Sequence, residues 1–349
     1  MRVVFAEKPS MGRAIAGAIG LSGSGKTHIR GRDLKGRDVV VTWGIGHLVA
    51  LVEGFEAYDP AMKVWKSEHL PFIPPQFKTA VVTNSKDQFQ AVKQILSDPG
   101  VEDVVVATDA GREGELIALY TFEKIGVKKP TLRLWVSSLT DEAIREGYGQ
   151  MKPWSEYKPL QDSAQCRSEA DWIVGLNGTR AITLMARRMG RKEHGAWAVG
   201  RVMTPTLAIL VQRELEIRQH VPKDFWTLEG AFQATGGAYK GKWFGPNGDR
   251  IESEAQAKAL LNKVQGKPAR VAKLETREVR RNPESFFDLT GLQKEANKRF
   301  GFTAAETLEI AQELYEAKVL SYPRTNSCHL TEADERKAPG WLKAVGHIP

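Results

Sequence analysis

The chain has 349 residues, of which 42% are hydrophobic and 26% charged, a composition typical of a soluble globular protein with two or three domains. Lys and Arg number 50 against 42 Asp and Glu, so the formal net charge of +8 favours a polyanionic partner without naming one. The only cysteines, Cys166 and Cys328, exclude a disulfide framework and a four-cysteine zinc site. No signal-peptide core and no run of about 18 apolar residues is present, so we expect a cytoplasmic protein.

Residues 1–150 alternate strand-like and helix-like stretches, a pattern typical of helices packed on a largely parallel sheet. The continuous apolar run at 104–107 suits a strand that is buried on both faces. An α/β domain is therefore expected, with strands at 3–6, 103–107 and 131–136 and helices at 10–19, 113–124 and 141–147.

After residue 150 the pattern changes twice. Residues 155–218 are helical, with a basic loop from Arg187 to Gly195 and a second helix that starts near Thr204. After Pro222 the chain becomes aromatic and β-rich, and later it becomes helical again. We predict strands at 225–232, 238–244 and 269–279, and helices at 253–264, 292–300 and 304–317.

The segment Gly20–Thr27 reads Gly-Leu-Ser-Gly-Ser-Gly-Lys-Thr and matches the phosphate-binding P-loop pattern. A working P-loop follows a buried strand and opens a helix. Here a helix is predicted before the segment and a hairpin, at 28–41, after it. We therefore interpret the segment as a flexible connector and expect no ATP site.

Acidic residues follow the predicted strand 103–107. The carboxyl end of a strand in an open α/β sheet is where ligands bind, and carboxylates grouped there can hold Mg²⁺. The sequence alone equally allows Glu113 and Glu115 to act only as favourable charges at a helix N-terminus. Glu7 and Lys8 follow the first strand, so they share a crevice with Asp109 and Glu113 if the two strands are neighbours.

This arrangement, a strand ending in Glu and a later strand followed by Asp-x-Asp-x-Glu, resembles the Toprim domain of topoisomerases, primases and related nucleases. Gly111 stands where the second Asp of that pattern is usual. One possible metal ligand is therefore missing, and the number of metal ions is left open.

Beyond the Toprim pattern, the chain is similar to type IA DNA topoisomerases, most closely to their topoisomerase III branch, and the resemblance covers nearly its whole length. The family usually has Gln where Met203 stands and Asp where Asn326 stands, so we expect altered local DNA contacts and an unchanged nucleophile. The resemblance is carried by the stretches Thr42–Leu48, Arg133–Thr140, Ala170–Asn177, Val199–Leu207, Leu289–Asn297, Gln312–Glu316 and Ser321–Thr325.

The resemblance implies an α/β Toprim domain followed by helical and β-containing domains, a multidomain α+β architecture. It places a Toprim domain at 1–152, the first part of a helical DNA-binding domain at 153–220, the first part of a β-rich arch at 221–280 and the start of a gate domain at 281–349. Because the family's gate domain continues well past its tyrosine, we expect the C-terminal part of the core to be absent here.

The resemblance also implies the roles of site residues. Tyr322 would attack DNA and form a 5′-phosphotyrosine link, with Arg324 on the scissile phosphate, Lys8 offsetting transition-state charge and Glu7 protonating the departing 3′ oxygen. Mg²⁺ would be held by Glu7, Asp109 and Glu113. The residues expected to line the single-strand groove are Trp65, Arg167, Arg180, Ala198, Val199, Gly200, Arg201, Val202 and Met203.

The expected activity is ATP-independent passage of DNA through a break in one strand, which relaxes negative supercoils or decatenates. The expected partner is single-stranded or negatively supercoiled DNA near a bacterial nucleoid or plasmid. Two alternatives stay open. A Toprim nuclease or primase would not need Tyr322, and a shortened chain could bind single-stranded DNA without strand passage. We interpret Tyr315, which lies on an apolar helical stripe, as structural, and the Arg187–Lys192 loop as solvated.

Overall fold

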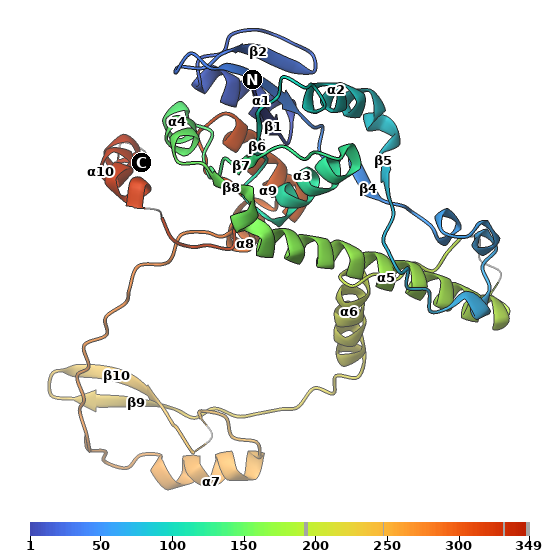
Figure 1. The fold of residues 1–349 in the computed structure, drawn as a ribbon. Helices are drawn as coiled ribbons and strands as arrows, with labels where there is room; N and C mark the ends of the chain where they lie inside the picture. Colours follow the sequence, from blue (N-terminus) through green and yellow to red (C-terminus); the bar gives the residue numbers. More distant parts are fainter. Residues whose placement is uncertain (192–194, 247, 331, 347–349) are drawn as a thin grey trace. The chain divides into compact units, whose positions relative to one another are not determined.

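A computed structural model describes residues 1–191, 195–246, 248–330 and 332–346 (Figure 1). The chain divides into two compact units, one made of Met1–Thr204 and Glu284–Pro349 and the other of Pro205–Pro283. The mixture of an α/β sheet, helical segments and a β-hairpin confirms the expected multidomain α+β class. Lys192 of the predicted basic loop lies outside the described residues.

The first unit is built on a sheet whose described strands have the order β2 (His28–Arg32), β3 (Asp38–Trp43), β1 (Arg2–Ala6), β6 (Asp103–Ala107), β7 (Thr131–Arg133) and β8 (Lys152–Pro153). The four central strands are parallel, and the two edge strands pair antiparallel. Val3–Ala6 and Val104–Ala107 are fully buried because helices cover both faces of the sheet, which explains their continuous apolar runs. The predicted α/β fold of this region is confirmed.

Two hydrophobic cores lie on opposite faces of this sheet. On one face, α1 (Pro9–Ala18) and α4 (Asp141–Gly149) pack with Val4 and Ala6. On the other, α2 (Lys86–Leu96) and α3 (Arg112–Ile125) pack with Val3 and Phe5. Alternate residues of each strand thus enter different cores, as the two-residue period of a strand requires.

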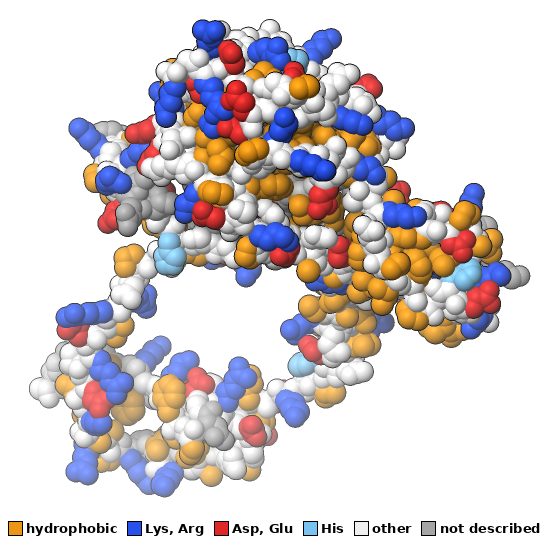
Figure 2. All heavy atoms as spheres, in the orientation of Figure 1, with side chains coloured by type: hydrophobic (Ala, Val, Ile, Leu, Met, Phe, Trp, Pro, Cys, Tyr) orange, Lys and Arg blue, Asp and Glu red, His pale blue; other side chains and the backbone are white. Residues whose placement is uncertain are grey.

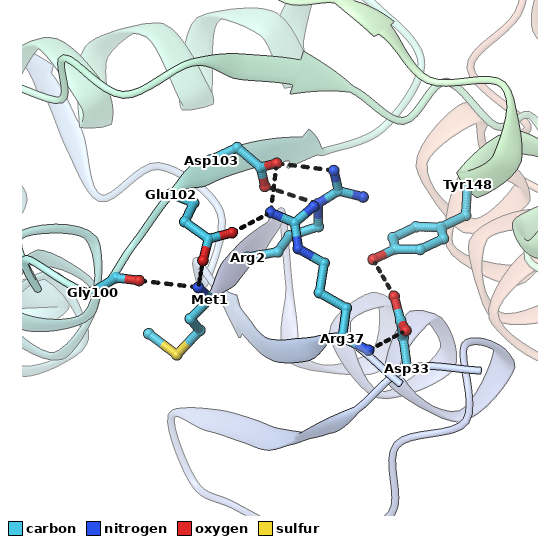
Figure 3. Close-up of polar contacts among 8 residues, drawn as sticks. All are labelled: Met1, Arg2, Asp33, Arg37, Gly100, Glu102, Asp103 and Tyr148. Carbon is cyan, nitrogen blue, oxygen red and sulfur yellow. Dashed lines mark hydrogen bonds and ion pairs between the residues drawn. The ribbon is translucent and has the colours of Figure 1, made fainter. Parts of the chain in front are cut away.

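A polar network ties together the amino ends of β1 and β6 (Figure 3). Arg2 donates to the Asp103 carboxylate through Nε (2.8 Å) and Nη2 (2.9 Å), and Arg37 Nη2 lies 2.9 Å from the same carboxylate. Arg2 and Asp103 are also partners in the strand register. This two-pronged contact fixes the alignment of the two strands, so their carboxyl ends, followed by Glu7 and Asp109, finish level with each other.

The helix α5 (Lys158–Arg188) is 31 residues long, which corresponds to about 46 Å at about 1.5 Å per residue. It confirms the helix predicted in this region. Residues 49–81, including the antiparallel pair β4 (Val49–Leu51) and β5 (Thr79–Val81), pack against it. The Trp172 indole donates to the Val52 carbonyl (2.6 Å), and its ring contacts Phe55, Tyr58, Phe72 and Phe77.

The C-terminal segment of the first unit contains α8 (Leu289–Phe300), α9 (Ala304–Glu316) and α10 (Glu332–Val345). Helix α8 starts three residues before the prediction because the Asp288 side chain accepts from the Gly291 N–H (2.6 Å) and caps the helix. Helix α9 opens with a capping box between Thr303 and Glu306 and confirms the second predicted helix.

The second unit contains most of α6 (Met203–Arg218), the hairpin of β9 (Glu229–Ala234) and β10 (Gly237–Lys242), and α7 (Glu254–Val264). The helix predicted to start near Thr204 and the helix predicted at 253–264 are therefore confirmed. The predicted strand at 225–232 begins later than expected, because Trp226 forms only an isolated bridge with Ile251.

Two strand predictions need correction. Residues 269–279 form no strand in the part of the chain that the structure describes, because no neighbouring segment pairs with them, and a strand needs such a partner. The strand predicted at 131–136 ends at Arg133, beside the point where β6 gives way to the Asp109 loop.

The P-loop-like segment Gly20–Thr27 follows α1 and precedes the β2–β3 hairpin. This is the context that argued against a nucleotide site. Among the helices in the described ranges, none combines the length and the apolar character needed to cross a membrane.

Candidate active site and nucleic-acid interface

Two carboxylates meet where β1 and β6 end. The Asp109 backbone N–H donates to Glu7 Oε2 at 3.2 Å, because the two strands are parallel neighbours in register. The structure therefore brings Glu7 and Asp109 together in one crevice, as their positions after the strands predicted. Their roles in binding a metal or DNA stay predictions.

The electrostatics of this pair favour a positive partner. Burial, and then the negative charge of Asp109, raise the pKa of Glu7 to about 7. Burial likewise raises the pKa of Asp109, against the opposing effect of Lys8 and Arg324. Within the described residues, the buried Oδ1 of Asp109 has no hydrogen-bond partner. A divalent cation would satisfy this oxygen and relieve the repulsion between the carboxylates, so these residues fit a metal ion.

Glu113 stands in the first turn of α3, and its Oε1 lies 2.7 Å from His47 Nε2. Hydrogen bonding between them raises the pKa of His47 and lowers that of Glu113. In the described part of the chain, no three His, Cys, Asp or Glu side chains converge closely enough to hold a metal on their own. To bind the same ion as Asp109, Glu113 would first have to break its hydrogen bond to His47.

Gly111, where the Toprim pattern usually has Asp, lies at the N-terminus of α3 with an extended backbone (φ −175°). A Cβ added there would meet no described atom within 4 Å. The missing carboxylate is therefore not excluded by packing, and a substitution to Asp has room.

Tyr322 is held against the sheet domain from the far end of the sequence. Its backbone N–H donates to the Ser137 carbonyl (3.0 Å), and its ring packs edge-on against Tyr315, with centroids 5.5 Å apart. Burial raises the pKa of the Tyr322 hydroxyl, the charges of Asp109 and Glu7 raise it further, and Arg324 opposes this shift. The predicted nucleophile and the Toprim carboxylates thus lie in one electrostatic neighbourhood.

A cavity of about 690 Å³ opens beside this neighbourhood. It lies between α3, α5 and the Tyr322 segment, and apolar residues of β4 and the helices form part of its wall. The charged or ionisable side chains that line it are His47, Arg112, Glu113, Tyr120, Arg167, Asp171, Tyr322 and Arg324. Arg167 and Arg324 therefore share a cavity with Tyr322, whereas sequence reasoning gave no role to His47 or Arg112.

The segment that leads to α6 runs back along α5 toward this cavity. Thr183 Oγ1 accepts from the Trp197 N–H (2.8 Å), Thr179 Oγ1 accepts from the Val199 N–H (2.9 Å), and Arg201 lies 3.2 Å from the Asp171 carboxylate. A Cβ on Gly178 would come within 2.7 Å of Val199, so glycine permits this close approach. Of the predicted groove residues, Val199 and Arg201 thus contact the face of α5 that leads toward Arg167.

Arg180, also predicted to line the groove, is instead a packed residue. It is 4% exposed, and its guanidinium donates to the Met62 carbonyl (2.8 Å) and stacks over Phe55 (4.0 Å) and Trp65 (5.0 Å). Its charge is already engaged, so a direct phosphate contact by Arg180 does not fit this conformation. Trp65, which is half-buried, is held in place by this stack.

Glu115 does not have the helix-end role that the sequence alone allowed for it. It does not act as a favourable charge at an exposed helix end, because it is fully buried and accepts from Arg133 Nε (2.6 Å) and Trp154 Nε1 (2.7 Å). Arg133 in turn donates to the carbonyls of Thr108 (2.8 Å) and Asp109 (2.9 Å). This buried pair holds the loop that presents Asp109.

Lys and Arg side chains are spread over the face of the molecule seen in Figure 2 and do not gather in one patch. On this face, the basic side chains therefore mark no DNA path by themselves. The cavity beside Tyr322 is the candidate interface, because it brings Arg112, Arg167 and Arg324 together around this tyrosine.

Comparison with known proteins matches residues 2–139 to the Toprim domain and residues 155–347 to a DNA topoisomerase family. The chain is 42% identical to DNA topoisomerase 3 of Shouchella clausii over 333 residues, which cover 95% of this chain and 44% of that protein. It is 41% identical to DNA topoisomerase 3 of Bacillus subtilis, over 94% of this chain and 43% of that protein. The chain thus spans less than half the length of these curated relatives.

Among solved structures, full-length topoisomerase I from Thermotoga maritima has the same fold, with a TM-score of 0.64 at 20% identity. The match covers 98% of this chain and 52% of that one. Two family matches that together cover most of the sequence, and relatives of about 40% identity, agree with this fold. The chain therefore belongs to the type IA DNA topoisomerases and is topoisomerase III-like.

Proposed function

We propose that this chain cleaves one strand of DNA, with Tyr322 as the nucleophile, and holds the broken end as a 5′-phosphotyrosine ester. The observation that carries the proposal is the position of Tyr322. It shares a 690 Å³ cavity with Arg324, Arg167 and Glu113, beside the Glu7–Asp109 pair. A tyrosine with only a structural role has no need of this concentration of charged groups.

In the proposed reaction, the Tyr322 oxygen forms a bond to phosphorus while the bond from phosphorus to the 3′ oxygen breaks. The phenol must give its proton to solvent water, and because the pKa of Tyr322 is raised in the DNA-free protein, this loss requires positive charge nearby. Arg324 supplies that charge and can hold the phosphate through paired hydrogen bonds. Lys8 would offset the charge of the transition state.

The departing 3′ oxygen needs a proton. Glu7 is suited to provide it, since in the metal-free protein its pKa of about 7 keeps a fraction of this carboxyl protonated at neutral pH. Asp109 and Glu113 would hold Mg²⁺, with Glu7 as a further oxygen ligand when ionised. When bound, the ion would supply positive charge that orients a neighbouring phosphate and neutralises the carboxylates.

We further propose that single-stranded DNA reaches the cavity along α5 and residues 198–203, and that the ester bond lets religation proceed without ATP. Passage of another strand, with relaxation of negative supercoils or decatenation, is proposed for the architecture of which this chain carries the part from the Toprim domain to the tyrosine. The domain limits given above and a cytoplasmic location with nucleoid or plasmid DNA are part of the same proposal.

A second candidate function is binding of single-stranded DNA without cleavage. It is favoured by the pairing of two site residues with protein groups, since Lys8 lies 2.5 Å from Glu316 and Glu113 lies 2.7 Å from His47. A site that stays in this state would bind DNA and leave it intact. A Toprim nuclease or primase accounts less well for the chain, because the topoisomerase match extends through residues 155–347.

One assay distinguishes cleavage by Tyr322 from binding without cleavage. Single-stranded DNA labelled at its 5′ or 3′ end is incubated with the protein and Mg²⁺, and the products are denatured and resolved. Strand cleavage through Tyr322 predicts a protein-linked fragment that carries the 3′ label, because the protein holds the 5′ phosphate. Binding alone predicts a mobility shift before denaturation and intact DNA after it.

A further inference from the structure

Tyr315 is a buried tyrosine whose hydroxyl has no structural use in the DNA-free protein. Its side chain is fully buried and packs in the core formed by α1, α4 and one face of the sheet. Among the groups that the structure describes, its hydroxyl finds no hydrogen-bond partner. A phenylalanine would pack equally well and would avoid the penalty for burying an unpaired hydroxyl, so packing alone does not explain a tyrosine here.

The surroundings of this hydroxyl connect it with the reaction centre. The Tyr315 ring contacts the Tyr322 ring edge-on, with centroids 5.5 Å apart. Burial raises the pKa of Tyr315, and the negative charge of Asp109 is the next largest cause, followed by Tyr322, Glu7 and Glu316. Four other buried polar atoms of the described residues lack a hydrogen-bond partner, and two of them, Thr108 Oγ1 and Asp109 Oδ1, lie at the carboxyl end of β6; the other two belong to His69 and Tyr120. Unused hydrogen-bonding capacity is therefore present at the carboxyl end of β6, beside the reaction centre.

We propose that Tyr315 is a further catalytic residue, whose hydroxyl donates a hydrogen bond to the Tyr322 oxygen when that oxygen carries negative charge. This inference rests on the proposed cleavage by Tyr322. No proton is transferred to or from Tyr315. The hydrogen bond forms as the Tyr322 oxygen gives its own proton to solvent water, and it persists through the transition state.

In the DNA-free protein the Tyr315 hydroxyl makes no hydrogen bond to Tyr322, so the two hydroxyl groups have to approach each other when DNA is bound. The charge on Tyr322 favours this approach, because a phenolate oxygen binds a donor roughly twice as strongly as a neutral hydroxyl oxygen does. In cleavage the phenolate attacks phosphorus, and in religation it leaves phosphorus, so both directions pass through the same charged oxygen. A donor that acts on this oxygen accelerates both directions equally and leaves the cleavage equilibrium unchanged.

The test compares wild-type protein with Tyr315→Phe, which removes only the hydroxyl. Four quantities are measured: the melting temperature, the Kd for single-stranded DNA, the rate of covalent adduct formation, and the rate of religation after salt is added. We expect an equal or higher melting temperature and an unchanged Kd. Both rates should fall together by about 100- to 1,000-fold, the range seen when one donor to a transition-state oxyanion is removed.

Tyr148→Phe is the matched control. Tyr148 is partly buried against the same core in which Tyr315 is fully buried, but its hydroxyl donates to Asp33, in the network at the amino ends of the strands (Figure 3). This variant should form and religate the adduct at wild-type rates. Unchanged rates in Tyr315→Phe would overturn the inference, and so would a rate loss accompanied by a lower melting temperature or a weaker Kd.

Failure of the inference and failure of the proposed function give different results. If Tyr315→Phe forms the adduct as fast as wild type, the inference about Tyr315 falls and the cleavage by Tyr322 stands. If the wild-type chain forms no adduct under conditions where it binds DNA, the proposed function falls, and the inference that depends on it falls too.

Discussion

Lys8 Nζ lies 2.5 Å from Glu316 Oε1, an ion pair that joins the end of β1 to the end of α9 across 308 positions of sequence. Lys318 Nζ pairs in the same way with Asp141, at 2.5 Å. Together with the buried Tyr315 and the hydrogen bond from Tyr322 to Ser137, these contacts dock the tyrosine segment on the sheet domain. The docking places Tyr322 beside the carboxylates of Glu7 and Asp109. It also engages the Lys8 ammonium group in the ion pair with Glu316.

Replacing Glu316 by Gln is therefore expected to release Lys8 for a DNA phosphate. We expect about a twofold to fivefold tighter binding of single-stranded DNA and a salt dependence steeper by about 0.7, the contribution of one phosphate contact on a single strand. Fluorescence anisotropy at several salt concentrations measures both. Glu313→Gln, on the same helix, is the control, and the gain should vanish in a background that carries Lys8→Ala. A gain in DNA affinity that persists in the Lys8→Ala background would contradict the interpretation that Glu316 holds Lys8 away from DNA.

The Glu7–Asp109 pair predicts a particular dependence of stability on pH. The folded-state pKa of Glu7, about 7, lies above its ordinary value of 4.5, so the folded protein binds the Glu7 proton more tightly than the unfolded chain. Stability is consequently lost as pH rises from about 4.5 to about 7, and the loss is complete above that range. Glu7→Gln removes it, and should raise the free energy of unfolding at pH 8 by about 1–3 kcal/mol.

Urea denaturation in the presence of EDTA measures this difference. At pH 4 the variant and the wild type should be nearly equal in stability, and Glu53→Gln, an exposed position, should show no change at either pH. Equal effects of Glu7→Gln at pH 4 and pH 8 would mean that the cost of ionising the buried Glu7 carboxyl beside Asp109 is not the cause.

The buried Arg133–Glu115 pair predicts a large loss of stability when one partner is neutralised. Glu115→Gln leaves the fully buried Arg133 guanidinium without its counter-charge, and such a change costs about 3–5 kcal/mol. The exposed pair of Arg32 and Asp38 gives the comparison, since Arg32→Ala should cost less than about 1 kcal/mol. Urea denaturation of both variants tests the contrast, which fails if Glu115→Gln costs no more than Arg32→Ala.

The sequence predicted the sheet and the crevice because both depend on local patterns. The apolar runs 3–6 and 104–107 identify strands buried on both faces, and Glu7 and Asp109 follow those strands directly. Neighbouring parallel strands end at the same edge, so their proximity needed no knowledge of the rest of the fold.

Contacts between distant segments left no such pattern. The pairing of His47 with Glu113 and of Lys8 with Glu316 depends on how loops and helices dock, which no periodicity encodes. Glu115 looked like an exposed helix-end charge because its partner Arg133 comes from the next strand of the sheet. The strand predicted at 269–279 was wrong for a related reason, since β propensity does not supply a pairing partner.

A substitution of Arg167 tests the proposed path of single-stranded DNA along α5. Arg167 is exposed on that helix and lines the cavity that contains Tyr322. Arg167→Ala should weaken binding of single-stranded DNA uniformly across sequences and lower the salt dependence by about 0.7. Anisotropy titrations with oligonucleotides of different sequence measure both quantities. Arg32→Ala, on the edge strand β2, should bind as wild type does, and an unchanged salt dependence in Arg167→Ala would remove this residue from the path.

The central claim is that Tyr322 forms a covalent link with DNA, and Tyr322→Phe tests it most directly. Wild type and variant are incubated with 3′-end-labelled single-stranded DNA and Mg²⁺, denatured, and resolved for labelled protein. We expect an adduct from the wild type and at least a thousandfold less from Tyr322→Phe, with the Kd for DNA unchanged, because removal of a nucleophile abolishes covalent catalysis. An equal amount of adduct from both proteins, or cleaved DNA without any protein-linked product, would contradict the claim.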